Sequence, residues 1–495
     1  MKKTLIALFS FILLTSPTGQ AQDAKAVIDA AASALGATNL RTLQFSGWGF
    51  DYVFGQSYTG AGAWPRFSLP AYTMTIDFAA PAMRDDRRRA QIEDPPLGGG
   101  FQPLATEQRL ITLVNGAYAW DIVGDNAVAS GFRNDRQPNV IGRTEQIWLT
   151  PQGFVKLAAS SKATTRTATL RGAKKTIVTL DNATYGKLEA TLNDQNLIEH
   201  IERWFGHSVL GDTLIEADFT EYKDFNGVKF PTHIVQRQGG YPLLDLRVAD
   251  VRVNPAVAFD VPANIRNATP PASLVAPPEK LADGVWVFPT YAKSAVVEFR
   301  DHVVVIEAAE TEAQSIEIID GIKKAIPNKP IRYLVNTHSH FDHIGGMRTY
   351  AAEGATIVTH RDNIPFYQQV WSNPRTISPD RLSRSGKTAT FMGVTGTQLL
   401  TDGARRLVIY HYAGNMHNPG LLMAYLPAEK ILIEADSFSP PAAPLTAPPN
   451  ALVNLKHFVD SVDRLQLDVD QVIPVHGRVT KMDEAREILA KFLTK

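Results

Sequence analysis

The chain has 495 residues, of which 44% are hydrophobic and 20% are charged. That length predicts two or three domains, and that composition excludes a mainly disordered or collagen-like chain. Fifty basic and fifty acidic side chains cancel, so no overall positive charge would attract nucleic acid or anionic lipid. The absence of cysteine excludes disulfides and thiolate catalysis, so nitrogen and oxygen atoms would have to hold any transition metal.

The first residues have the pattern of an export signal. Two lysines precede an apolar run over residues 5–14, and a small-residue cleavage site, Gly19-Gln20-Ala21, follows. The apolar run is too short to cross a bilayer, which needs roughly twenty residues. We therefore expect residues 1–21 to be a signal peptide, with a mature chain that begins near Gln22, has no membrane span and is periplasmic or secreted. The alternative is an uncleaved anchor.

Residues 22–262 are predicted to form a β-rich domain. Apolar and polar side chains alternate in short runs bounded by Gly, Asn, Asp and Pro, as in antiparallel strands. The clearest strands are 72–78, 214–222 and 228–236, and helices are expected near 24–35 and 151–160. Asn226-Gly227 between two of these strands predicts a tight hairpin turn. We expect one large twisted sheet with a few helices, an α+β arrangement.

A different pattern begins after a proline-rich stretch. Six prolines between residues 255 and 278 predict a linker over 263–280. Strands then alternate with helices through residues 281–495, which predicts a layered α/β domain. The expected strands are 284–288, 295–299, 303–306 and 331–335, and helices are expected over 311–326 and after Phe341. The proline-rich run 439–450 is expected to be a loop.

The segment after strand 331–335 gathers metal-binding side chains. His338 and His340 are two residues apart on extended backbone, so they point the same way and can hold one ion. Asp342 and His343 leave the turn in another direction and can hold a second ion. Three histidines and one aspartate within six residues would crowd costly polar groups unless a metal bound them.

Three later residues repeat this placement. His417, Asp436 and His476 each lie just past an apolar strand, at the edge where open α/β sheets bind ligands. Each alone could equally be a solvated loop residue, but together they extend the candidate metal site. Four other histidines, His302, His360, His411 and His457, are expected to be structural.

Residues 281–495 resemble the metallo-β-lactamase-fold hydrolases. The family's His-x-His-x-Asp-His motif matches His338, His340, Asp342 and His343, and its later ligands match His417, Asp436 and His476. The resemblance implies a four-layer αββα sandwich with two metals at one edge. It implies that the first metal takes His338, His340 and His417. The second takes Asp342, His343 and His476, and Asp436 bridges the two.

Two positions depart from the family's pattern. Glu307 stands where the family usually carries an aspartate that contacts the metal-binding loop, so a longer carboxylate must make that contact. Met416-His417-Asn418 replaces a common Gly-His-Thr. Neither change removes a ligand, but both alter the groups around the ligands.

Such a site predicts hydrolysis. Two divalent ions lower the pKa of a shared water to give a bridging hydroxide at neutral pH, and Asp342 or Asp436 can orient it and accept its proton. Zinc is expected first, with iron or manganese possible for the same ligands. The expected substrate is a small molecule with an ester, lactone or β-lactam type bond. Residues 367–378 and the proline-rich run are expected to wall the pocket.

Two other functions stay open at this point. One is an iron-dependent oxidoreductase of the same fold, which metal analysis would distinguish. The other is a lipid- or ligand-binding periplasmic protein with a vestigial hydrolase domain. It is suggested because segments 116–120 and 225–232 resemble periplasmic lipoprotein-carrier half-barrels. Lipid that co-purifies with the protein would support this second alternative.

Overall fold

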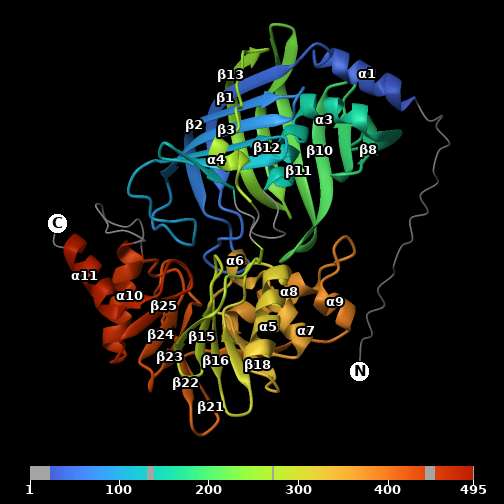
Figure 1. The fold of residues 1–495 in the computed structure, drawn as a ribbon. Coiled ribbons are helices and arrows are strands. Elements are labelled where there is room, and N and C mark those ends of the chain that lie inside the picture. The colour runs from blue at the N-terminus through green and yellow to red at the C-terminus, as the bar shows by residue number, and fades with distance from the viewer. Residues whose placement is uncertain (1–22, 131–138, 270–271, 441–451, 494–495) are drawn as a thin grey trace, which may run out of the picture.

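The computed structural model describes residues 23–130, 139–269, 272–440 and 452–493. The predicted signal peptide and most of the proline-rich run 439–450 lie outside these residues. The described chain forms a β-rich amino-terminal domain and a layered carboxy-terminal domain, which meet at loops (Figure 1). No described helix combines the length and apolar character that crossing a membrane requires.

In the described part of the amino-terminal domain, thirteen strands form one antiparallel sheet in the order β6-β5-β4-β3-β2-β1-β13-β12-β11-β10-β9-β8-β7. The strands are β1 (Thr42–Tyr52), β2 (Arg66–Asp77), β3 (Ala82–Gln91), β4 (Gln108–Asn115), β5 (Tyr118–Val123), β6 (Asn126–Ala129), β7 (Lys162–Leu170), β8 (Ala173–Asn182), β9 (Gly186–Leu192), β10 (Ile198–His207), β11 (Gly211–Phe225), β12 (Val228–Gln238) and β13 (Tyr241–Val253). The large antiparallel sheet predicted from alternating side chains is thus confirmed.

Helices cover one face of this sheet. They are α1 (Ala24–Ala34), α2 (Val140–Trp148) and α3 (Pro151–Leu157), followed by the 3-10 turn η1 (Ala158–Ser160). Their apolar sides and the inward residues of the strands form one core, which includes Phe45, Phe154 and Phe230. The sequence did not predict α2, whose apolar residues are few, but Ile147 and Trp148 bury it against this core.

The predicted hairpin turn joins β11 to β12. Asn226 and Gly227 both have positive φ, 53° and 86°, as a type I′ turn requires. The Asp224 carboxylate accepts a hydrogen bond from the Gly227 N–H over 2.8 Å. A residue with a β-branched side chain would be strained at either central position of this turn. Because the turn has only two central residues, it also sets the register of the strand pair.

Two sheets build the described carboxy-terminal domain. The first runs β14 (Glu279–Ala282), β15 (Val285–Phe288), β16 (Ser294–Glu298), β17 (Val303–Ile306), β18 (Ile331–Val335), β19 (Thr356–His360) and β20 (Thr390–Val394). The second runs β21 (Thr397–Thr401), β22 (Arg406–His411), β23 (Leu422–Leu426), β24 (Ile431–Glu434), β25 (Gln471–Pro474) and β26 (Thr480–Lys481). Both mix parallel and antiparallel pairs.

Helices cover the outer face of each sheet. Beside the first sheet are α5 (Glu312–Ala325), α6 (Phe341–Ile344), α7 (Met347–Glu353), the 3-10 turn η2 (Arg361–Asn363), α8 (Ile364–Ser372) and α9 (Arg381–Ser385). Beside the second are α10 (Leu452–Arg464) and α11 (Met482–Leu493). Helices, sheet, sheet and helices follow one another across the domain (Figure 1).

Three apolar cores hold these four layers together. One lies between the first sheet and its helices, one between the two sheets, and one between the second sheet and α10 and α11. Strand β17 contributes side chains to two of these cores. Val303 and Val305 face the helices, whereas Val304 and Ile306 face the other sheet. A strand covered on both faces must be apolar throughout. The expected four-layer sandwich is therefore confirmed.

The segment predicted to be a linker packs against both domains. Helix α4 (Ala263–Arg266) places Ile265 in a small core beside Trp120 of the amino-terminal sheet. Val275 is buried in the helix-side core of the carboxy-terminal domain. Strand β14 then begins at Glu279, within the range expected to be linker.

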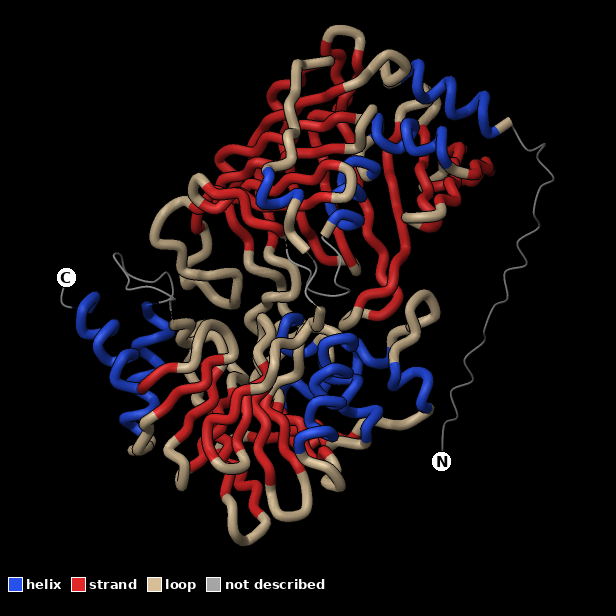
Figure 2. The backbone as a smooth tube through the Cα atoms, viewed as in Figure 1, coloured by secondary structure: helices blue, strands red, loops and turns tan. Residues whose placement is uncertain are grey.

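Loops fill the region where the two domains meet, and α6 lies there (Figure 2). From the amino-terminal domain come the connections between β1 and β2 and between β3 and β4. From the carboxy-terminal domain come the loops that follow β18 and β22. The strand ends with the predicted metal-binding residues therefore face the amino-terminal domain.

Candidate metal centre

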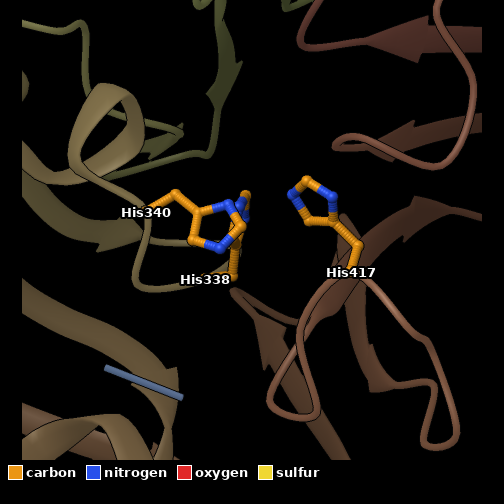
Figure 3. Close-up of side chains that lie close together, drawn as sticks. All are labelled: His338, His340 and His417. Atoms are coloured by element: carbon orange, nitrogen blue, oxygen red, sulfur yellow. The ribbon is translucent and has the colours of Figure 1, made fainter. Parts of the chain in front are cut away.

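Three histidines from two loops meet inside the carboxy-terminal domain. His338 and His340 follow β18, and His417 lies between β22 and β23. One nitrogen of each ring lies within 4.8 Å of the other two, and the rings gather around one point (Figure 3). The least buried of the three, His417, is 8% exposed. The chain thus brings together the histidines that the resemblance assigns to the first metal.

Each of these histidines has one buried nitrogen without a hydrogen-bond partner. These atoms are His338 Nε2, His340 Nδ1 and His417 Nε2. The opposite edges of two rings are occupied. His340 Nε2 donates to the carbonyl oxygen of Ser57 over 2.9 Å, and His338 Nδ1 lies 3.0 Å from the Thr337 hydroxyl. Buried polar atoms are normally satisfied, so the remaining lone pairs fit a shared transition metal.

A second group lies beside the first. It consists of Asp342, His343 and His476, and it also has one ligand atom from each residue within 4.8 Å of the others. Asp342 Oδ2 is 3.4 Å from Nε2 of both histidines. The two Nε2 atoms are 3.2 Å apart.

The outer nitrogens of this second pair are already bonded. His343 Nδ1 lies 3.1 Å from the Glu307 carboxylate, and His476 Nδ1 lies 2.9 Å from the carbonyl oxygen of Tyr291. Because both partners accept hydrogen bonds, each ring carries its proton at Nδ1. Burial opposes protonation of both rings, but the carboxylates of Asp342 and Asp436 raise their pKa values. Positive charge is therefore favoured between the rings, where a metal ion would take the place of the proton.

Asp436 lies between the two groups. It follows β24, and its Oδ2 is 2.8 Å from His343 Nε2, 3.3 Å from His338 Nε2 and 3.5 Å from His417 Nε2. Its Oδ1 is 3.4 Å from His476 Nε2. One carboxylate therefore contacts histidines of both groups, which is the position expected of a bridging ligand.

Burial and charge set the protonation of these residues. Burial and the neighbouring His417 lower the pKa of His340 to about 3, and burial with His343 lowers the pKa of His338 well below its usual value. Burial opposes ionisation of Asp436, but His343 and His417 hold its pKa well below the usual range. The neutral imidazoles of His338 and His340 and the ionised carboxylate of Asp436 are donors that zinc, iron and manganese accept.

Glu307 makes the supporting contact that the family assigns to a shorter carboxylate. It is fully buried and accepts hydrogen bonds from His343 Nδ1, from the Thr337 hydroxyl and from Asn336 Nδ2. Glu307, His338 and His343 also form a compact group, but Glu307 contacts His343 at Nδ1, the edge opposite to Asp436. Its role is to hold the loop and fix the ring, which supports metal affinity.

Two further residues hold the loops that carry the histidines. Asn418 Nδ2 donates to Ser339 Oγ over 3.1 Å and so joins the two loops. Tyr367 is fully buried and donates from its hydroxyl to Asn336 Oδ1 over 2.6 Å. The expectation that residues 367–378 wall the pocket is therefore wrong for Tyr367. Its aromatic ring suggested that it lines the pocket, but its hydroxyl instead holds Asn336, at the start of the loop that carries His338 and His340.

The four histidines expected to be structural lie apart from both groups. They are His302, His360, His411 and His457. Nε2 of His411 and of His457 lies 2.8 Å and 3.0 Å, respectively, from a backbone carbonyl oxygen. His302 Nδ1 lies 2.7 Å from the Asp301 carboxylate.

The amino-terminal domain also contacts the centre, which the sequence did not predict. Gln56 Nε2 donates to Asp342 Oδ1 over 2.8 Å, and Ser57 supplies the carbonyl that holds His340. These residues lie 286 and 283 positions before their partners. A glutamine and a serine in a loop carry no pattern that predicts such contacts.

Residues 287–476 match the family model of the metallo-beta-lactamase superfamily. The carboxy-terminal domain belongs to that superfamily. The motif and the four layers, both described above, agree with this assignment. The resemblance of the amino-terminal domain to carrier half-barrels stays a prediction.

Several solved structures are similar to this metallo-β-lactamase domain. A metallo-beta-lactamase from Pontibacter korlensis is 20% identical and covers 45% of this chain and 100% of its own, with a TM-score of 0.35. The mono-zinc form of FIM-1 from Pseudomonas aeruginosa is 20% identical and covers 44% of this chain and 93% of its own, with a TM-score of 0.35. No curated protein matches the chain.

Proposed function

We propose that this chain is an exported hydrolase that uses two divalent metal ions, zinc by preference, to cleave a small molecule. One observation carries the proposal. Three buried nitrogens, His338 Nε2, His340 Nδ1 and His417 Nε2, accept or donate no hydrogen bond and belong to a group compact enough for one cation. A second compact group, joined to the first by Asp436, supports two ions rather than one.

The proposed chemistry divides between the metals and the chain. Two divalent cations held by these residues would supply Lewis acidity and lower the pKa of bound water. Asp342 would bind the second metal and orient the attacking water through Oδ2, because its Oδ1 is occupied by Gln56. Asp436 holds negative charge between the two groups. Asn418 and Glu307 keep the loops, and hence the imidazole rings, in place.

We propose a substrate with an ester, lactone or β-lactam type bond. The superfamily is mostly hydrolytic, and none of these bonds requires a nucleophilic cysteine, which the chain lacks. The balanced charge of the chain argues against a nucleic-acid substrate. Binding loops outside the ligand set decide between these bonds.

A hydrolysis panel tests the proposed function. Metal-free protein, protein loaded with zinc, and protein treated with chelator are each given chromogenic lactam, lactone, ester and phosphodiester substrates. We expect hydrolysis of at least one lactam, lactone or ester by the zinc form, and loss of that activity with chelator. Metal-loaded protein that cleaves none of these three classes contradicts the proposal.

Export is a separate part of the proposal. It rests on the leader pattern over residues 1–21, which lies outside the described residues. Mass spectrometry of the protein from the periplasmic fraction should find an amino terminus near Gln22. Protein that keeps Met1 contradicts it.

A further inference from the structure

Two loops of the amino-terminal domain touch both loops that carry the first three histidines. The carbonyl oxygen of Gly55, between β1 and β2, accepts a hydrogen bond from the Phe341 N–H over 3.1 Å. The Gly98 N–H, between β3 and β4, donates to the carbonyl oxygen of Met416 over 2.9 Å. Phe341 adjoins His340 and Met416 adjoins His417. The amino-terminal domain therefore fixes backbone next to two candidate ligands.

Gln56 orients one carboxylate of the second group. Its amide donates to Asp342 Oδ1 over 2.8 Å, while Asp342 Oδ2 lies 3.4 Å from Nε2 of His343 and of His476. With one oxygen held by the amide, the other is directed to the two histidines. The amide nitrogen can only donate, so it pairs with a lone pair of the Asp342 carboxylate.

Ser57 does the same for a histidine of the first group. Its carbonyl oxygen accepts from His340 Nε2 over 2.9 Å. A carbonyl cannot donate, so it fixes the tautomer of His340 with a bare Nδ1. One short segment of the amino-terminal domain thus supports one residue of each metal group.

Gly99 leaves space for this arrangement. A Cβ atom at this position would lie 1.9 Å from Gln56 Oε1 and 2.9 Å from His340 Cε1. Gln102 holds the glycine loop, since its amide donates to the carbonyl oxygens of Leu97 and Gly99 over 3.0 Å and 3.2 Å. The close approach of this loop to both groups therefore depends on a missing side chain.

We propose that Gln56 is a positioning residue of the metal centre, supplied by a domain that the superfamily match does not include. Gln56 holds Asp342 for the second metal, and the Gly99 loop keeps Gln56 and His340 together. The inference rests on the proposed function, because it assumes that Asp342 and His340 bind metal. It assigns to the amino-terminal sheet domain a part in metal binding.

Gln56→Met tests this role because it keeps the length of the side chain and removes the donor. Zinc is added to metal-free protein in competition with a chromogenic chelator, and bound metal is counted after dialysis. We expect the second zinc equivalent to bind about 10-fold more weakly or worse, as for other residues that hold a metal ligand, with the first equivalent unchanged. With the fastest chromogenic substrate of the panel, kcat should fall while KM changes little.

Two variants serve as controls. Gln44→Met removes a half-buried amide of the same domain that donates to Thr75 Oγ1 and not to the centre. Asp212→Asn weakens the contact between domains, since Asp212 accepts from Thr376 and Ile377, but touches no candidate ligand. Both should bind two zinc ions as the unmodified chain does. If Asp212→Asn lowers the affinity for the second zinc ion as much as Gln56→Met does, the Gln56 amide acts only by joining the domains. The inference is then wrong.

Gly99→Ala provides an independent test. Its methyl group would displace Gln56 and the His340 ring, so both zinc equivalents should weaken. Thermal unfolding of the metal-free variants shows whether each is folded. If the unmodified chain binds two zinc ions and Gln56→Met binds them equally well, this inference alone fails. A chain that binds no zinc overturns the proposed function as well.

Discussion

Asp436 owes its position to an uncommon backbone conformation. Its φ is +60°, in the left-handed region that few residues other than glycine, asparagine and aspartate adopt readily. The turn directs the carboxylate from the end of β24 toward histidines of both groups. Glu307, with φ +73°, is a second carboxylate held in this way at a strand end. At both strand ends, a carboxylate that binds or supports a candidate metal ligand lies on backbone with positive φ.

Asp436→Asn tests the charge of this side chain, because it keeps the shape and removes the negative charge. Asparagine tolerates the same φ, so the fold should persist, but the charge that offsets repulsion between two cations is lost. We expect one metal equivalent to leave preferentially and hydrolysis to fall by about 10²-fold or more. Metal analysis and kinetics measure both. If the variant keeps two metals and a near-normal rate, Asp436 is only a strand-end residue.

Glu307→Gln tests the contact beneath His343. A glutamine can present its amide nitrogen to His343 Nδ1, which would disturb the tautomer that leaves Nε2 bare. We expect metal affinity to fall by about 10- to 100-fold, as for other residues that support a metal ligand. Zinc titration of the metal-free variant measures the change. Glu298→Gln, at an ion pair with Lys329 away from the centre, is the matched control and should bind zinc normally.

At the scale of elements, one carboxylate joins two of the helices behind the first sheet, α7 and α9. Asp380 caps α9 by accepting from the Ser383 N–H over 2.8 Å, and it also binds the Arg348 guanidinium on α7. Burial opposes its ionisation, but Arg348 and Ser383 lower its pKa to about 2, against an ordinary value of 3.8. The pair α7 and α9 is therefore stabilised by an ionised Asp380.

Asp380→Asn should destabilise the protein in a pH-dependent way. Because the folded state holds the proton less tightly than the unfolded state, the stabilisation is present above the ordinary pKa. It is lost as the pH falls from about 4 toward 2. At pH 7 we expect a loss of about 2 kcal/mol in unfolding free energy. Urea unfolding at several pH values measures it. A difference from the unmodified chain that does not shrink on acidification contradicts this account.

The elements themselves were largely predictable, and so was the set of candidate ligands. Apolar runs such as 303–306 specify strands buried on both faces. A histidine motif that directly follows a strand is expected to lie at the edge of the sheet. Contacts between distant segments were not predictable. Nothing in the sequence around Gln56 shows that it meets Asp342, and the apolar ring of Tyr367 gave no sign that its hydroxyl would hold Asn336.

At the scale of the whole molecule, a further contact that involves no candidate ligand joins the domains. The buried Arg375 guanidinium donates to the carbonyl oxygens of His207, Ser208 and Val209, at the turn between β10 and β11. Next to it, the Asp212 N–H donates to the Pro374 carbonyl oxygen over 2.7 Å. The His207 ring also lies 5.2 Å from the Phe54 ring and 5.7 Å from the Phe341 ring, so this contact continues to the loops beside the metal groups.

Arg375→Ala should loosen this contact. Three carbonyl oxygens lose their donor, and leaving such groups unsatisfied costs about 1–3 kcal/mol each when they stay buried. We expect the two domains to unfold in more clearly separated steps on calorimetry, and proteolysis between them to become faster. Arg166→Ala, at an exposed pair with Glu189 on the sheet, should leave both unchanged. A single unshifted transition in Arg375→Ala contradicts the expectation.

The carbonyl of Ser57 has a consequence for how the protein is made. It precedes His340 by 283 residues, so a growing chain completes the acceptor long before the ring that it orients. The hydrogen bond that holds His340 in this tautomer can form only after the amino-terminal sheet has formed and the later domain has docked onto it. Tight metal capture would then be among the last events of biogenesis. Metal uptake during refolding would report the docking of the two halves rather than the folding of either one.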